Sequence, residues 1–315
     1  MTVRIAAVHA APALLDRDAC IGKACDWIAR AGREGVDLLV FPEVFVPGFP
    51  YWINCYPPLV QGELNLRYMR SSLEVPGPEI ETVCKAAKAA GVTVVLGVSE
   101  RDGGTCYNTQ VFIASDGTLL GKHRKLQPTY AERYIWGQGD GSTLRVWDTP
   151  VGRVGGLACW EHTMNLARQA LIDQGLQIHA GSWPALGTLA GFDAMFDDQV
   201  EAMSRAHALT GQCFVVVAQD TVTQEMLDVM SDALGRQNFL SVGGGWSAVI
   251  HPWGTYVAGP HRGGEETLVV ADVDLDEIDA VKGFVDAAGH YSRPEVLRLM
   301  FDDRAYRPMS RSTDG

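Results

Sequence analysis

Short runs of β-branched and other apolar residues recur along this chain, and they constrain its fold more than any other feature. Eight such runs lie at residues 3–8, 36–41, 92–98, 111–114, 153–159, 214–218, 247–250 and 267–273. Runs of this length and composition predict β-strands. Helical patterns lie between several of them, at residues 16–33, 78–90, 161–174 and 193–210. The alternation predicts an α/β fold in which helices cover a buried sheet that also contains some antiparallel strands.

The chain is predicted to form one domain over residues 1–290. No Pro/Ser-rich linker, short-period repeat or low-complexity tract divides these residues. From about residue 290 the sequence is rich in arginine and proline and ends in RPMSRSTDG. We expect residues 291–315 to be a tail that lies on the surface or contacts a neighbouring subunit.

Composition excludes several classes of partner. The 315 residues carry a formal net charge of -12, and a protein that binds nucleic acid needs a clustered positive face instead. No apolar segment approaches the roughly 18 residues that a membrane-spanning helix needs. The seven cysteines are odd in number and lie largely within apolar patterns, which disfavours a disulfide framework. We therefore expect a protein of the reducing cytoplasm that binds neither nucleic acid nor membrane.

Three side chains with reactive chemistry follow predicted strands. Glu43 follows the run at 36–41 in FPEVFVPGFPYW, Lys125 lies in GKHRKLQPTY, and Cys159 ends RVGGLAC. Ligands collect beyond the carboxyl ends of strands in α/β sheets, so these residues are candidates for one site. Each alone also has an ordinary interpretation, as a solvated glutamate, a surface lysine or a core cysteine.

The residues after Cys159, WEHTMNLARQAL, predict the first turns of a helix. Because the positive end of a helix dipole favours a thiolate, we expect the pKa of the Cys159 thiol to be lowered from about 8.5 toward neutrality. His162 lies three residues further on and could act as the general base of a Cys/His pair. A metal site is disfavoured, since the sequence has no C-x-x-C or H-E-x-x-H motif and its eight histidines are scattered.

Three segments together resemble the nitrilase family, in its true nitrilase branch. They are FPEVFVPGFPYW with Glu43, HRKLQPTYAERYIWGQGDG with Lys125 and Glu132, and GGLACWEH with Cys159. Similarity in PGPEIETVCKAAKAAGVTVVLGVSERDGGTCYNT and in GHYSRPEVLRL extends the resemblance over nearly the whole chain. The resemblance implies a four-layer αββα sandwich that dimerises into an αββααββα block, as a homodimer or a higher homo-oligomer.

The resemblance also implies a hydrolase that converts an organic nitrile into the carboxylic acid and ammonia. Cys159 would carry thioimidate and thioester intermediates, Glu43 would act as base, Lys125 would protonate nitrogen and Glu132 would orient Lys125, with no metal or organic cofactor. The nitrile could be aliphatic, arylaliphatic or a dinitrile. The alternatives are an amidase or N-carbamoyl hydrolase with the same Glu-Lys-Cys site, and a catalytically silent homologue that serves as an assembly module.

An apolar substrate pocket is expected beside the reactive residues. The candidate pocket residues are aromatic and imidazole side chains that follow predicted strands: Phe49, Tyr51, Trp52, Trp160, His162 and Trp183. Aromatic side chains are just as typical of a hydrophobic core, so each of these residues has a core position as its alternative.

Overall fold

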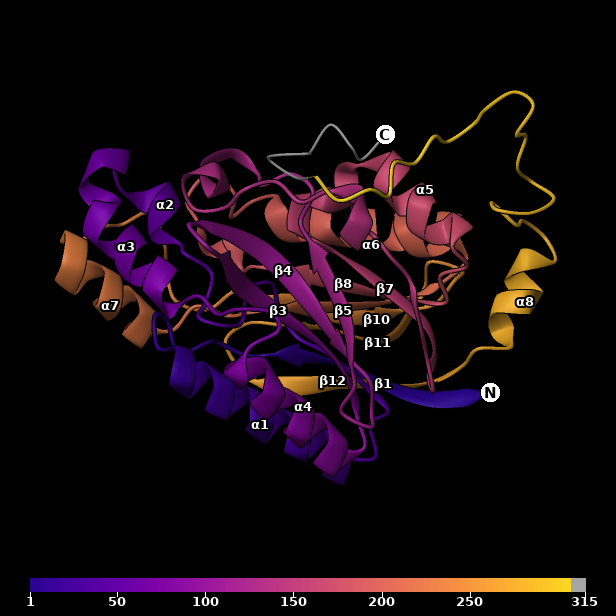
Figure 1. Ribbon diagram of the computed structural model, residues 1–315, viewed down its shortest axis with the longest axis horizontal. Coiled ribbons are helices and arrows are strands. Elements are labelled where there is room, and N and C mark those ends of the chain that lie inside the picture. Colours follow the sequence, from indigo (N-terminus) through magenta and orange to yellow (C-terminus); the bar gives the residue numbers. More distant parts are fainter. Residues whose placement is uncertain (307–315) are drawn as a thin grey trace, which may run out of the picture.

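Two six-stranded mixed sheets lie face to face at the centre of the computed structural model, which describes residues 1–306 (Figure 1). The strands of the first sheet are Thr2–His9 (β1), Leu38–Val40 (β2), Thr93–Asp102 (β3), Thr105–Ile113 (β4), Leu119–Arg124 (β5) and Thr267–Asp274 (β12). Those of the second sheet are Trp147–Thr149 (β6), Gly152–Ala158 (β7), Ile178–Trp183 (β8), Phe214–Gln219 (β9), Trp246–Ile250 (β10) and Tyr256–Arg262 (β11). The strand order is β12-β1-β2-β3-β4-β5 in the first sheet and β11-β10-β9-β8-β7-β6 in the second.

Helices cover the outer face of each sheet. The α-helices are Arg17–Arg33 (α1), Trp52–Cys55 (α2), Gly62–Ser71 (α3), Pro78–Ala90 (α4), Asn165–Asp173 (α5), Phe196–Gly211 (α6), Gln224–Leu234 (α7) and Glu277–Lys282 (α8). The 3₁₀ turns are Pro58–Gln61 (η1), Tyr130–Tyr134 (η2), Gly141–Thr143 (η3), Cys159–Thr163 (η4) and Leu186–Thr188 (η5). Because α1 and α4 pack on the first sheet and α5 and α6 on the second, the molecule has four layers (Figure 1). The predicted αββα sandwich is confirmed.

Local sequence signals explain where the two helices on the first sheet begin and end. The Asp16 side chain caps the amino end of α1, where it satisfies a backbone N–H that lacks a partner within the helix. α4 begins with Pro78, whose fixed φ suits a first helical position, and ends at Gly91 with a φ of 69°. The helices predicted at residues 16–33 and 78–90 are confirmed.

The structure adds strands that the apolar runs did not predict. Three of these strands lie at sheet edges: β5, β6 and β11. Many of their residues are partly exposed to water, so their sequences mix charged and apolar residues and show no apolar run. β8 is a central, fully buried strand, but its sequence IHAGSW contains histidine, glycine and serine. The helix predicted at residues 161–174 is divided instead, because η4 ends at Thr163 and α5 begins at Asn165.

The strand directions bring several strand ends to one end of the sandwich. β1, β2 and β3 are mutually parallel, and so are β7, β8 and β9. α2, α3 and α7 also lie together at one end of the molecule (Figure 1), where the Tyr56 hydroxyl donates to the carbonyl oxygen of Gly235. The segments after β2 and β7 carry Glu43 and Cys159, so this end is where the candidate residues can meet.

The last described residues run along the outside of the sandwich (Figure 1). Between Gly283 and Tyr306 the structure contains no helix or strand, and the backbone N–H of Tyr306 donates to Asp140 at 2.7 Å. Residues 307–315, the end of the predicted tail, lie outside the described residues. The domain boundary at residue 290 stays a prediction. Among the helices within residues 1–306, none has both the length and the apolar character that crossing a membrane requires.

Candidate active site

Glu43 lies in a turn after β2 that packs directly against β3. A Cβ atom on Gly97 of β3 would lie 2.2 Å from the carbonyl oxygen of Pro42, so this close approach requires glycine. The Glu43 side chain is buried, and its Oε1 accepts hydrogen bonds from Asn108 Nδ2 at 2.5 Å and Lys125 Nζ at 2.9 Å. Its Oε2 accepts no hydrogen bond from any described residue. This second oxygen is therefore free to accept a proton.

Lys125 follows β5 directly and lies between two carboxylates. Its buried Nζ is 2.9 Å from Glu43 Oε1 and 2.7 Å from Glu132 Oε2. Glu132 lies in η2, and its Oε2 also accepts the backbone N–H of Thr129 at 2.9 Å. Burial alone would lower the pKa of Lys125, but the carboxylates of Glu132 and Glu43 raise this pKa well above its usual value. Lys125 is therefore an ammonium ion and a proton donor.

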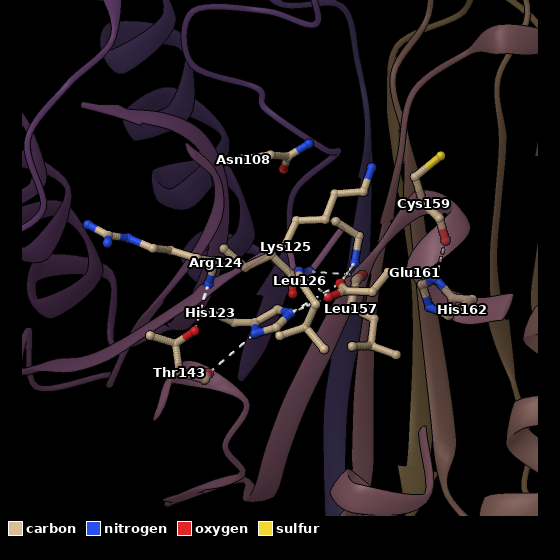
Figure 2. A network of polar contacts seen from close by, with 12 residues as sticks. Asn108, His123, Arg124, Lys125, Leu126, Thr143, Leu157, Cys159, Glu161 and His162 are labelled. Carbon is tan, nitrogen blue, oxygen red and sulfur yellow. Dashed lines mark hydrogen bonds and ion pairs between the residues drawn. The ribbon is translucent and has the colours of Figure 1, made fainter. Parts of the chain in front are cut away.

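Cys159 directly follows β7 and opens η4. Its φ of 50° lies in the left-handed region, which costs a residue with a side chain on the order of 1–3 kcal/mol. The ring of His162 holds this turn, with Nδ1 2.6 Å from the carbonyl oxygen of Cys159. Figure 2 shows the carbonyl group directed toward His162 and the sulfur directed the other way, to the side where Lys125 Nζ also points. The strained turn thus presents the sulfur to the site.

The four reactive side chains converge. A carboxylate oxygen of Glu43, a carboxylate oxygen of Glu132 and the Cys159 sulfur all lie within 4.8 Å of one another. Lys125 Nζ bonds both carboxylates. A nucleophile, a proton acceptor and a proton donor therefore share one buried site.

The same three groups could offer ligands to a metal ion, but their surroundings oppose one. The ammonium of Lys125 already bonds Glu43 and Glu132 and supplies the positive charge that a cation would bring. A second cation would be repelled by this ammonium at close range. The donor set fits acid–base and nucleophilic chemistry better than metal binding.

The expected lowering of the Cys159 pKa is wrong. Burial, and next the charge of Glu43, raise the pKa of this thiol well above its usual value, although the Lys125 ammonium acts in the opposite direction. The helix dipole contributes little because η4 spans only Cys159–Thr163 and the following α-helix starts at Asn165. The thiol consequently needs a base, and burial raises the pKa of Glu43 to about 7, which suits that role.

His162 does not serve as that base in this geometry. Its Nδ1 contacts the carbonyl oxygen of Cys159, and its Nε2 lies 2.8 Å from His179 Nε2. Burial lowers the pKa of His162 to about 4, so the ring is neutral. Both nitrogens are engaged away from the sulfur, and His162 supports the backbone of the nucleophile.

A largely apolar cavity of about 420 Å³ opens beside these groups. Glu132 is part of its wall, so the cavity reaches the reactive cluster. Most of the other lining residues are apolar or aromatic, and the lining is Phe49, Asn54, Thr129, Tyr130, Trp160, Leu186, Leu189 and Phe192. A cavity of this size and character can hold a small organic molecule.

A family model described as carbon-nitrogen hydrolase matches residues 4–283 of the chain. The chain belongs to the carbon-nitrogen hydrolase family. It is therefore a hydrolase that acts on carbon–nitrogen bonds.

Several curated relatives of this carbon-nitrogen hydrolase match nearly its whole length. An aliphatic nitrilase of Rhodococcus rhodochrous is 39% identical over 312 residues, which cover 98% of this chain and 85% of the relative. A nitrilase of Paraburkholderia phymatum is 41% identical over 307 residues, which cover 98% of this chain and 88% of the relative. These matches confirm the predicted membership of the nitrilase group.

Solved structures share the fold of this carbon-nitrogen hydrolase. The carbon-nitrogen hydrolase of Helicobacter pylori G27 superposes with a TM-score of 0.70 at 19% identity, covering 90% of this chain and 92% of the other. Nit3 of Saccharomyces cerevisiae, a member of the nitrilase superfamily, gives a TM-score of 0.69 at 20% identity, covering 92% and 96%. At these identities the likeness concerns the fold alone.

The six candidate pocket residues of this carbon-nitrogen hydrolase fall into two groups. Phe49 and Trp160 line the cavity, whereas the other four lie outside its described lining. The other four side chains are fully buried and bound elsewhere: Tyr51 donates to Asp220, Trp52 donates to Asn65, and Trp183 stacks on His162. Leu186, Leu189 and Phe192 line the cavity instead, from a segment after β8 that the strand pattern did not select.

Asn108, His123 and Glu161 are polar residues near the site that the sequence analysis did not select. Asn108 binds the Glu43 carboxylate with its side chain and accepts the backbone N–H of Lys125 with its carbonyl oxygen. Glu161 and His123 form a buried pair below Cys159 and Lys125 (Figure 2). Asn108 and Glu161 lie within segments that resemble the nitrilase family, but only the spatial arrangement reveals what they contact.

Proposed function

We propose that this protein is a nitrilase that hydrolyses an organic nitrile to the carboxylic acid and ammonia. The observation that carries the proposal is the convergence of the Cys159 sulfur with the carboxylates of Glu43 and Glu132 within 4.8 Å, around the Lys125 ammonium. The adjoining apolar cavity and the curated nitrilases of 39% and 41% identity support a small nitrile as substrate.

The first half of the reaction forms a thioimidate. Glu43 Oε2 takes the proton of the Cys159 thiol, and the sulfur attacks the nitrile carbon. The C≡N bond becomes C=N, and the Lys125 ammonium donates the proton that the nitrogen then needs. The buried ion pairs to Glu43 and Glu132 hold this donor in place.

The second half releases ammonia and then the acid. A water molecule adds to the thioimidate, and the nitrogen of the tetrahedral intermediate receives the two hydrogens of this water and leaves as ammonia. The proton that Glu43 took from the thiol passes to Lys125, so the two groups are again a carboxylate and an ammonium. The resulting thioester is attacked by a second water, from which Glu43 takes a proton. The carbon–sulfur bond breaks, the acid leaves, and the thiol of Cys159 is restored.

A panel of nitriles and their matching amides tests this function. Ammonia and acid are measured for aliphatic nitriles, arylaliphatic nitriles and dinitriles, each beside its amide. Turnover of nitriles at rates well above those of the amides is expected. Turnover of amides alone would overturn the proposal in favour of an amidase or N-carbamoyl hydrolase, and no turnover with no adduct on Cys159 would favour a silent homologue.

The rate is expected to fall as pH decreases through about 7. Glu43 must be ionised to accept the thiol proton, and burial raises its pKa to about 7. Lower pH therefore removes the base, while higher pH preserves it. A profile of kcat/KM from about pH 5 to pH 9 checks this, because kcat/KM reports groups of the free enzyme. An acid limb near the ordinary glutamate pKa of about 4.3 would contradict the assignment.

Replacing Phe192 with alanine is expected to weaken the binding of short aliphatic nitriles. Phe192 lines the cavity and packs against the core, so the change removes apolar contact with a small substrate. A loss of one such contact is worth about 1–3 kcal/mol, or a rise in KM of roughly 10- to 200-fold. Steady-state kinetics over a series of nitriles measure it, and Leu66→Ala, an exposed leucine on α3, is the control. An unchanged KM for every nitrile would contradict this assignment of the cavity.

We also propose that the chain forms a homodimer or higher homo-oligomer in the cytoplasm. Support for association comes from exposed apolar side chains on α5, α6 and the terminal arm, among them Leu166, Leu209 and Leu297. Support for a reducing compartment comes from the seven cysteines, none of which forms a disulfide within residues 1–306. Light scattering of the purified protein tests the first proposal, and a monomer at all concentrations would contradict it.

A further inference from the structure

The reacting groups of the site come from different sheets. Glu43 and Lys125 follow strands of the first sheet, whereas Cys159 follows β7 of the second. Most side chains in the core between the sheets are apolar, and apolar attraction has no directional preference. Hydrogen bonds are directional, so polar links between the sheets can define the distance between the sulfur and the ammonium.

Glu161 forms such a link with its two carboxylate oxygens. Its Oε2 accepts the backbone N–H of Ala158, the residue before the nucleophile, at 3.0 Å. Its Oε1 accepts the backbone N–H of Leu126, the residue after Lys125, at 2.8 Å. One buried carboxylate thus binds the backbone beside each of the two reacting groups.

His123 completes this link from β5. Its Nε2 lies 3.0 and 3.1 Å from the two carboxylate oxygens of Glu161, and its Nδ1 lies 3.3 Å from the carbonyl oxygen of Thr143. The His123 ring thus lies between the Glu161 carboxylate and the Thr143 carbonyl oxygen. Burial alone would raise the pKa of Glu161, but His123 and the two backbone N–H groups keep this pKa below its usual value.

We propose that Glu161 is a positioning residue that holds the Cys159 sulfur and the Lys125 ammonium at reacting distance across the two sheets. Figure 2 shows Glu161 below both groups, with the sulfur and the ammonium pointing to the opposite side. Glu161 lies outside the described lining of the cavity, so it acts through the backbone of its neighbours. This inference rests on the proposed nitrile hydrolysis.

The ratio of amide to acid products reports this role. The tetrahedral intermediate has one carbon–nitrogen and one carbon–sulfur bond. When the nitrogen is protonated, the carbon–nitrogen bond breaks and ammonia leaves. When it is not, the carbon–sulfur bond breaks, the sulfur leaves and regains its proton, and the amide is released. A displaced Lys125 would protonate the nitrogen less often, so a larger share of the tetrahedral intermediate would break down to the amide.

The deciding variant is Glu161→Gln. The glutamine carbonyl oxygen can accept one backbone N–H, but the amide NH₂ cannot accept the other. We expect the amide fraction to rise several-fold and kcat to fall about 10- to 100-fold, as for other supporting residues, with KM nearly unchanged. A loss of stability alone lowers the amount of active enzyme and leaves the product ratio unchanged.

Glu100→Gln is the matched control. Glu100 is another buried glutamate, on β3, and it accepts from Thr109 and Arg124 without contacting the nucleophile turn. The amide fraction of the Glu100→Gln variant should equal that of the wild type. A second variant, His123→Gln, can still donate to Glu161 but lacks the ring that bridges Glu161 and Thr143, and it should raise the amide fraction less than Glu161→Gln.

Alkylation of Cys159 by iodoacetamide, followed by peptide mass spectrometry, gives a readout that needs no turnover. The nearby ammonium favours the thiolate, so its displacement in Glu161→Gln should slow alkylation several-fold, whereas a loosened site would speed it. A wild-type product ratio and alkylation rate in Glu161→Gln, or an equal change in Glu100→Gln, would overturn the inference. If the wild type hydrolysed no nitrile, the proposed function would fail, and alkylation would still decide the role of Glu161.

Discussion

Replacement of Lys125 by methionine is expected to remove activity and to destabilise the fold at neutral pH. The variant leaves the carboxylates of Glu43 and Glu132 buried together without their shared cation. Breaking a buried ion pair in this way costs about 3–5 kcal/mol. Loss of the proton donor at the nitrile nitrogen lowers kcat by about 10²- to 10³-fold. Urea unfolding and steady-state kinetics measure the two effects.

The destabilisation by Lys125→Met should depend on pH with a definite sign. Without the ammonium, burial and the charge of Glu132 raise the pKa of Glu43 further above its value in the unfolded chain. The native variant then binds more protons than its unfolded state, so its stability rises as pH falls and decreases as pH rises. The difference from the wild type should therefore be smaller near pH 5 than near pH 8. A constant difference would show that the carboxylates do not carry the effect.

Lys122→Met is the matched control for Lys125→Met. Lys122 lies on β5, and its Nζ also bonds a buried carboxylate, that of Glu100. Glu100 keeps its bonds to Arg124 in this variant, and Lys122 is partly exposed. We expect a loss of about 1 kcal/mol or less and activity within a few-fold of the wild type.

Replacement of Cys159 by alanine is expected to abolish ammonia release. The sulfur forms both covalent intermediates, and removal of a nucleophile of this kind lowers kcat by up to about 10⁶-fold. The thiol is fully buried and small, so the variant should fold with a loss of about 1 kcal/mol. Intact-mass measurement after acid quenching should detect a substrate adduct on the wild type and none on Cys159→Ala.

Cys213→Ala is the control for the loss of a buried thiol. Cys213 is as deeply buried as Cys159 but packs beside α6, at the start of β9. Its alanine variant should keep the adduct and nearly full activity. Measurable ammonia release by Cys159→Ala, or loss of the adduct in Cys213→Ala, would place the nucleophile elsewhere in the chain.

Local patterns predicted much of the fold and selected Glu43, Lys125 and Cys159, whereas Glu132 was selected through the resemblance to the nitrilase family. The apolar runs predicted most strands of both sheets, and helix signals predicted α1 and α4 closely. Such patterns work because strand alternation and helix caps depend on neighbouring residues in the chain. Edge strands such as β5 and β11 were missed because part of each strand faces water, and their sequences therefore lack a run of apolar residues.

The surroundings of each side chain could not be predicted in this way. Trp183 and Phe49 are both buried aromatic residues of one apolar cluster, yet only Phe49 also lines the cavity. Glu161 and Asn108 lie within segments that resemble the nitrilase family, but their roles depend on partners far away in the chain. Which of two similar side chains faces the cavity depends on sheet register and loop path, which are long-range properties.

The sequence by itself determined that the chain alternates strands and helices and that Glu43 and Cys159 follow strands, because these features are local. Only the tertiary structure decided that these groups meet, that the pKa of the Cys159 thiol is raised, and that Glu43 carries the free oxygen. Distances between remote residues and the loss of water around a buried charge arise from packing, and packing joins residues that the chain separates.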